Sequence, residues 1–270
     1  MCMDVEVLGN RGARFTIIAR GVDPSFINAI RRTVMADVAV PAVDKVFIAE
    51  NSGVLYDEII AHRIGLIPLK GGEGLVHPSN CECGGKGCPR CEAILTLEVE
   101  APEDAYTVYS GRLKPEGSVF VANNDIPIAV LNKGQRIALE AHARLGSGRE
   151  HAKWQPVSGA VVKYEPIIEI DTEKCSLSAK CVQACPKKIL AIEGNNLKVI
   201  SVWDCTLCKE CVEACPNGAI SVSYNPANAM LMLESEGSLS PQELIFAACE
   251  VLKDKFESIR IALENAKEAS

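Results

Sequence analysis

Seven cysteines between residues 175 and 215 are spaced in the way that thiolate ligands of iron-sulfur clusters are spaced. The segment CTLCKECVEACP, which runs from Cys205 to Pro216, has the spacing C-x2-C-x2-C-x3-C-P. In a loop of this kind the first three thiolates surround one cluster, and the fourth cysteine reaches a different cluster. The spacing therefore predicts one [4Fe-4S] cluster with a complete set of ligands: Cys205, Cys208, Cys211 and, from an earlier run, Cys185.

The earlier run, CSLSAKCVQACP, lacks one cysteine, because Ser178 stands at the position that corresponds to Cys208. The second set of thiols is therefore Cys175, Cys181 and Cys215 only. Three thiolates suit a [3Fe-4S] cluster, or a [4Fe-4S] cluster whose fourth iron takes water or the Ser178 oxygen. An empty second site is a further alternative, and structural zinc or free thiols are the alternatives for both sets.

A separate glycine-rich stretch, CECGGKGCPRC, contains four more cysteines: Cys81, Cys83, Cys88 and Cys91. Two short arms of cysteines joined by a flexible turn suit four thiolates that close tetrahedrally on zinc. Such a site has no open position, which indicates a structural role. Reactive surface thiols are the alternative, because the first arm is C-x-C; we expect nearby His77 to be a loop residue and not a ligand.

The composition favours metal ligation over disulfide bonds. The chain has 270 residues, 13 cysteines and a formal net charge of -7. No apolar run approaches the roughly 18 residues of a membrane span, and the first residues do not resemble a signal peptide. We therefore expect a cytoplasmic protein without membrane contact, whose thiols stay reduced and whose acidic surface does not favour direct nucleic-acid binding.

The sequence has none of the common catalytic or nucleotide-binding motifs: no G-x-S-x-G, no GxxxxGK[ST], no GxGxxG after a strand and no H-E-x-x-H. Asp57, Glu58 and His62 offer carboxylates and an imidazole close together in sequence. Nothing else completes a reaction site around them, so we predict that they are structural and that the chain has no catalytic site.

The elements that would position these residues can be predicted from periodicity. Residues 4–20 alternate as a β-hairpin, a helix starts at Asp23-Pro24 and ends before Pro41, and residues 42–165 favour mainly strands and turns. Residues 167–224 repeat after a shift of 30, which predicts a small domain with two similar halves. After the strand-like MLMLES, the sequence SPQE predicts a capping box at the start of a long amphipathic helix.

Phe26 to Leu69 resembles the signature of the assembly subunit of RNA polymerases, the family of bacterial alpha, its eukaryotic counterpart and its archaeal D-type counterpart. Many archaeal members resemble this chain in having a late ferredoxin-like insert, and the eukaryotic counterpart has a four-cysteine zinc loop at a similar place. The resemblance implies an α+β fold with a discontinuous dimerisation domain, a mostly β insert domain and a ferredoxin-like domain. The expected ranges are 1–40 and 226–270 for dimerisation, 41–165 for the insert with its zinc loop 81–91, and 166–225 for the iron-sulfur domain.

The same resemblance implies partners. Members of the family pair with the small subunit L, and the heterodimer is the platform on which the large catalytic subunits assemble. The interface would come from the two amphipathic helices, through Phe26, Ile27, Ile30, Val34, Ile245, Ala248, Leu252, Phe256 and Ile259. The alternative is that these apolar stripes serve only an internal core. A competing function, suggested by the cysteine runs alone, is a ferredoxin-type electron-transfer subunit of an oxidoreductase.

Overall fold

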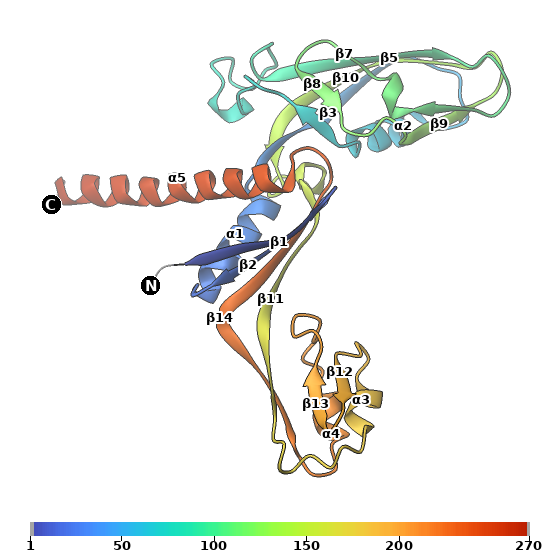
Figure 1. The fold of residues 1–270 in the computed structure, drawn as a ribbon. Helices are drawn as coiled ribbons and strands as arrows, with labels where there is room; N and C mark the ends of the chain where they lie inside the picture. The colour runs from blue at the N-terminus through green and yellow to red at the C-terminus, as the bar shows by residue number, and fades with distance from the viewer. Residues whose placement is uncertain (1–2, 269–270) are drawn as a thin grey trace. The chain divides into compact units, whose positions relative to one another are not determined.

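The computed structural model describes residues 3–268 (Figure 1). The contacts within the chain divide it into two compact units, each made of several separate stretches of the sequence. One unit comprises residues up to Gly9 together with Thr16–Asn28 and Val161–Met232. The other comprises Asn10–Phe15, Ala29–Ala160 and the residues from Leu233 onward. Cys2 lies outside the described residues. The domain boundaries expected from the sequence stay a prediction.

One four-stranded sheet has the order β1-β2-β14-β11, with bounds β1 (Asp4–Arg11), β2 (Arg14–Arg20), β11 (Val157–Ile170) and β14 (Ile220–Ser235). The predicted N-terminal hairpin is confirmed, and its turn contains Gly12 in the left-handed region at φ 59°. The predicted strand MLMLES is part of β14, which extends back through Pro226 to Ile220 as one strand. Both of its neighbours, β2 and β11, hydrogen-bond to β14.

Both predicted amphipathic helices are present, α1 (Pro24–Ala36) and α5 (Pro241–Glu268). At the start of α1, the Ser25 backbone N–H donates to Asp23 Oδ1 over 2.7 Å, so Asp23 satisfies a free amide of the first turn. At α5, the Ser240 N–H donates to Glu243 Oε2 over 2.7 Å and the Glu243 N–H donates to Ser240 Oγ over 3.3 Å. The reciprocal pair is the predicted capping box.

A second sheet, of order β3-β10-β5-β7, forms the centre of residues 39–147. The elements of this region are β3 (Ala39–Asn51), α2 (Asp57–Gly65), β4 (Leu69–Gly71), β5 (Glu92–Glu100), β6 (Tyr106–Tyr109), β7 (Lys114–Pro115), β8 (Val119–Val121), β9 (Pro127–Leu131) and β10 (Arg136–Ser147). Its fully buried side chains include Ile60, Ile64, Leu95 and Ile137, which belong to one hydrophobic core. Short 3-10 turns lie at Pro78–Asn80, Ser110–Arg112 and Ala152–Trp154.

The helix α2 corrects the expectation of strands and turns at this point of the chain. Its first turn contains Asp57 and Glu58, and its last turn contains His62 and Arg63, charges that complement the helix dipole. Asn51 Nδ2 donates to Asp57 Oδ1 over 2.7 Å. These residues therefore lie at the two ends of a helix.

The ferredoxin-like segment contains α3 (Lys180–Ala184), the paired strands β12 (Leu190–Glu193) and β13 (Asn196–Val199), and α4 (Glu210–Glu213). Its small core includes four of the cysteines, Cys181, Cys185, Cys205 and Cys211, beside Ile189, Leu190 and Ile220. Cysteine side chains thus take the place that large apolar residues occupy in an ordinary core. A cluster bound by them would be part of the packing of this segment.

Candidate metal centres and partner surface

The glycine-rich loop between β4 and β5 brings four thiols together. Neighbouring Sγ atoms are 3.4 Å apart for Cys81 and Cys83, 3.5 Å for Cys81 and Cys88, 3.5 Å for Cys83 and Cys91, and 3.7 Å for Cys88 and Cys91. All four lie within 4.8 Å of one another. Four thiolates placed tetrahedrally about 2.3 Å from zinc would be about 3.8 Å apart. The four sulfur atoms therefore fit a single zinc ion.

Glycines give this loop its tight path. Gly85 and Gly87 have φ values of 75° and 93°, in a region where a Cβ atom is unfavourable. After the turn, the Cys91 N–H donates to the Cys88 carbonyl over 2.9 Å. The backbone therefore returns the second cysteine arm to the first within a few residues.

The thiols of this loop differ in burial and in pKa. Cys81 and Cys91 are buried, whereas Cys83 and Cys88 are partly exposed. Hydrogen bonding with Cys81 and Cys91 lowers the pKa of Cys83 to about 6, and burial raises the pKa of Cys91 to about 12. Zinc binds thiolates, so its binding would release protons here and would weaken as the pH falls.

His77 is not one of these four ligands. Its Nδ1 lies 2.8 Å from Ser79 Oγ and its Nε2 lies 3.2 Å from Glu150 Oε1. Glu150 also pairs with Arg144 over 3.1 Å, and Arg144 pairs with Asp44 over 2.8 Å. The imidazole therefore belongs to a charged network that links the loop to β3 and β10.

Four cysteines of the ferredoxin-like segment line one cavity: Cys185, Cys205, Cys208 and Cys211. Burial raises the pKa of Cys211, and the charges of the other three thiols raise it further. Cys181 has different neighbours, since burial and then the charges of Cys215 and Cys175 raise its pKa. The seven cysteines thus fall into the same two groups in space that their spacing predicts.

The sulfur atoms within each of these two groups lie farther apart than the ligands of a single metal ion. Among the described residues, the group of Cys81, Cys83, Cys88 and Cys91 is the place where three or more ligand atoms come within 4.8 Å of one another. A multi-iron cluster holds its cysteine ligands farther apart than a single ion does. Thiols that surround a cavity without meeting therefore fit an iron-sulfur cluster better than zinc.

The two cysteine runs have the same unusual backbone. Leu177 and Leu207 have φ values of 52° and 58°, and Ala179 and Lys209 have 58° and 64°. Non-glycine residues pay about 1 kcal/mol each for this left-handed conformation. The run that contains the exposed Ser178 therefore has the same loop conformation as the complete run, with the same unfavourable left-handed residues.

One residue near the complete set was not predicted from the sequence. Lys163, on β11, is partly buried and its Nζ donates to the backbone carbonyl of Trp203, two residues before Cys205. Burial lowers the pKa of Lys163, while the charges of Cys205 and Asp204 act in the opposite direction. No spacing rule relates Lys163 to the cysteine motif, because the fold alone brings them together.

The residues predicted for the partner interface differ in exposure. Ile27, Ile30, Val34 and Ala248 are buried within the chain itself, and Ile245 and Leu252 are partly buried. Phe26, Phe256 and Ile259 are 46%, 69% and 57% exposed. The buried residues form the chain's own core, and the exposed ones are available to a partner.

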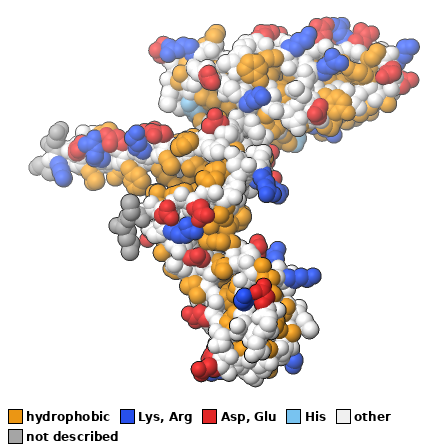
Figure 2. All heavy atoms as spheres, in the orientation of Figure 1, with side chains coloured by type: hydrophobic (Ala, Val, Ile, Leu, Met, Phe, Trp, Pro, Cys, Tyr) orange, Lys and Arg blue, Asp and Glu red, His pale blue; other side chains and the backbone are white. Residues whose placement is uncertain are grey.

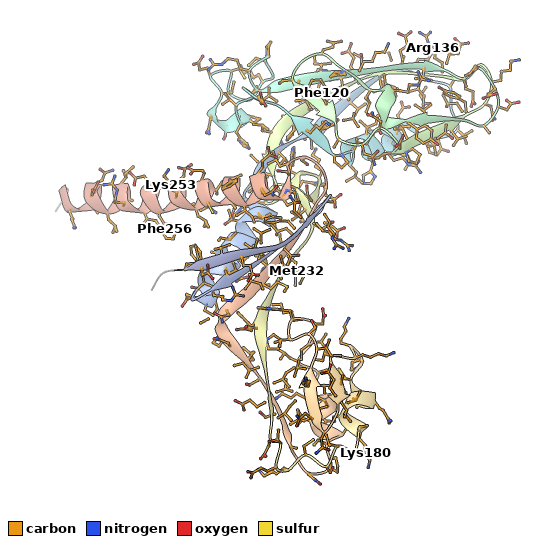
Figure 3. The ribbon with its side chains drawn as sticks, in the orientation of Figure 1. Phe120, Arg136, Lys180, Met232, Lys253 and Phe256 are labelled. Carbon is orange, nitrogen blue, oxygen red and sulfur yellow. The ribbon has the colours of Figure 1, made fainter. Side chains whose placement is uncertain are left out.

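The exposed members on α5 continue a buried stripe. Leu244 and Ala248 are buried, and Leu252, Phe256 and Ile259 follow them at steps of three or four residues. Hydrophobic side chains follow one side of the helix and charged side chains the other (Figure 2). Figure 3 labels Lys253 and Phe256 on α5; because they are three residues apart, their side chains point only about 60° apart around the helix axis. No helix among residues 3–268 is both long and apolar enough to span a membrane.

Comparisons with known proteins match both cysteine-containing regions. The RNA polymerase Rpb3/RpoA insert domain matches residues 46–173, and the 4Fe-4S dicluster domain matches residues 167–216. The second match and the cysteine geometry indicate iron-sulfur binding.

Similar proteins match the chain over nearly its whole length. DNA-directed RNA polymerase subunit Rpo3 of Archaeoglobus fulgidus is 40% identical, over 98% of this chain and 99% of the relative. The subunit of the same name from Methanothermobacter thermautotrophicus is 38% identical, over 95% and 97% of the two chains. That of Thermoplasma volcanium is 30% identical, over 94% and 97%.

Proposed function

Because the chain belongs to the family of DNA-directed RNA polymerase subunits that contains archaeal Rpo3, we propose that it is a non-catalytic assembly subunit of that polymerase. It pairs with the small subunit L in the cytoplasm and forms a platform for the large catalytic subunits. Nucleotidyl transfer takes place on those subunits. The relatives give no support to an electron-transfer subunit of an oxidoreductase.

The observation that most supports pairing is the apolar stripe of α5. Its first half packs inside the chain, but Phe256, Ile259 and Leu263 are more than half exposed. Burial of such a side chain stabilises a complex by roughly 1.5–3 kcal/mol compared with exposure. A helix whose apolar side extends beyond its own core gains this energy when a second subunit covers it.

The metal centres have structural roles in this proposal. Cys185, Cys205, Cys208 and Cys211 hold a [4Fe-4S] cluster, and Cys81, Cys83, Cys88 and Cys91 hold zinc. The matching backbone of the two runs supports a second cluster, bound by Cys175, Cys181 and Cys215 with an open position at Ser178. Loss of the clusters would loosen the core of this segment, and we propose that it weakens assembly of the polymerase.

The domain organisation expected from the sequence is part of the proposal. Residues 1–40 and 226–270 form the dimerisation domain, residues 41–165 the insert with zinc loop 81–91, and residues 166–225 the iron-sulfur domain. Two inserted domains then depend on metals, and the discontinuous part contacts subunit L.

Co-expression with a subunit L under anoxic conditions tests this function. We expect a one-to-one complex on size exclusion, with about one zinc per chain and about four irons for one cluster, or seven to eight for two. A folded chain that contains clusters but ignores subunit L, and that instead accepts electrons from a ferredoxin reductase, would overturn the proposal.

A further inference from the structure

The complete cluster site lies beside a cation from outside the cysteine motif. Lys163 belongs to β11, the strand that leads into the ferredoxin-like segment, and its Nζ bonds to the carbonyl oxygen of Trp203. Trp203 lies within a tight turn, which the Cys205 N–H closes by donating to the Val202 carbonyl over 3.1 Å. The ammonium group therefore fixes the turn that presents the first thiolate of the complete set.

The surroundings of Lys163 contain charges of both signs. Cys205 and Asp204 lie close enough to favour its charged form, whereas Lys187 and burial disfavour it. No carboxylate forms a salt bridge with Lys163 in the described part of the chain. Its charge is thus directed to a backbone carbonyl and to the cysteine loop, and not to an acidic partner.

A cluster with four thiolate ligands is anionic, and it becomes more negative when it is reduced. A nearby cation stabilises the reduced form more than the oxidised form, and the effect is stronger where water is excluded. The Cys205 sulfur also accepts a hydrogen bond from the Leu207 N–H over 3.4 Å, which acts in the same direction.

We propose that Lys163 is a positioning residue for the complete cluster site: it holds the turn before Cys205 and places a positive charge beside the cluster. This inference rests on the proposed binding of a cluster by Cys185, Cys205, Cys208 and Cys211. It predicts two separable effects of the lysine, one on the reduction potential and one on the retention of the cluster.

The test uses the full-length chain in complex with subunit L, prepared without oxygen. Lys163→Met keeps the length of the side chain but removes its charge and its donor. We expect this variant to contain as much iron and sulfide as the wild type, to have a more negative reduction potential, and to lose its cluster to an iron chelator about tenfold faster, a change of about 1.4 kcal/mol. Lys163→Arg should restore both properties.

Lys198→Met is the matched control, because Lys198 is an exposed lysine of the same segment that pairs with Glu193 over 2.7 Å. Its potential and rate of cluster loss should equal those of the wild type. Wild-type potential and rate in Lys163→Met would overturn the inference, whereas absence of iron from the wild type would overturn the proposed cluster itself. If Lys163→Met does not fold, Lys163→Gln, which is also neutral, replaces it with the same expected shift in potential.

Discussion

At the scale of single residues, the two cysteine runs differ at one potential ligand atom. Ser178 has an oxygen where Cys208 has a sulfur, and the backbone on either side of each residue is left-handed in both runs. An alcohol oxygen is a poorer ligand for cluster iron than a thiolate. The loop around Ser178 therefore has the backbone conformation of a run with a fourth thiolate ligand, but the Ser178 side chain does not supply that thiolate.

Replacement of Ser178 by cysteine should complete the second site. We expect iron and sulfide per chain to rise towards about eight of each, and any signal of a three-iron cluster to disappear from the electron paramagnetic resonance spectrum. Ser176→Cys is the matched control, because a thiol at that position does not meet the spacing of the motif. Equal iron contents in the two variants would contradict the prediction.

Replacement of Cys91 by serine should empty the zinc loop. The variant loses one of four thiolates from a closed tetrahedral site, so we expect its zinc content to fall from about one per chain to nearly none. Atomic absorption measures this directly. Cys249→Ser, which changes an exposed cysteine of α5, should keep all of its zinc. Retention of zinc by Cys91→Ser would mean that the metal is bound elsewhere.

Residue spacing could predict which cysteines come together but not which other residues approach them. The intervals between cysteines are local properties of a loop, and so they can be recognised in the sequence. Lys163 approaches the turn at Trp203 because the fold brings β11 beside it, and no local pattern encodes such a contact. No local pattern encodes the contact between Glu150 and His77 either.

At the scale of elements, the helix ends follow from a few side chains. The capping box at Ser240 and Glu243 and the cap at Asp23 are local hydrogen-bonding patterns, and both could be predicted. The helix α2 was missed because only Ile60 and Ile64 are buried in its two turns, too few to show a period. The continuity of β14 through Pro226 has no local signal, because proline cannot donate a hydrogen bond to a neighbouring strand and is uncommon inside strands.

Substitution of Ser240 by alanine should destabilise α5 and the unit that contains it. The change removes the acceptor of the Glu243 N–H, and we expect the free energy of unfolding to fall by about 1 kcal/mol in urea denaturation. Ser258→Ala is the control, since Ser258 donates only to the Asp254 carbonyl within the helix. It should change stability by less than about 0.5 kcal/mol; an equal loss in both variants would argue against the cap.

At the scale of the whole molecule, exposed hydrophobic surface distinguishes a subunit from a protein that acts alone. Phe246, Phe256 and Leu263 on α5 are 71%, 69% and 61% exposed, and the helix has a charged side that needs no partner. The sequence shows the apolar stripe but not where the chain's own core ends beneath it. That limit depends on tertiary packing, which leaves Ala248 buried and Phe256 exposed.

Replacement of Phe256 by glutamate should weaken the complex with subunit L. A carboxylate in an apolar interface loses both the buried area and its own hydration, so we expect at least a tenfold loss of affinity, about 1.4 kcal/mol. Isothermal titration calorimetry gives the dissociation constant. Ser258→Glu is the control and should bind as the wild type does, because Ser258 is exposed and, two residues after Phe256, lies about 160° away from it around the axis of α5. Similar losses for both variants would place the interface elsewhere.

The most direct test of the proposed role is an assembly experiment with and without this chain. The large polymerase subunits are combined either alone or with the complex of this chain and subunit L, and promoter-independent RNA synthesis is measured on the sized fractions. An assembly subunit predicts a large, active particle only when the chain is present. Assembly and RNA synthesis at the same yield without the chain would contradict that role.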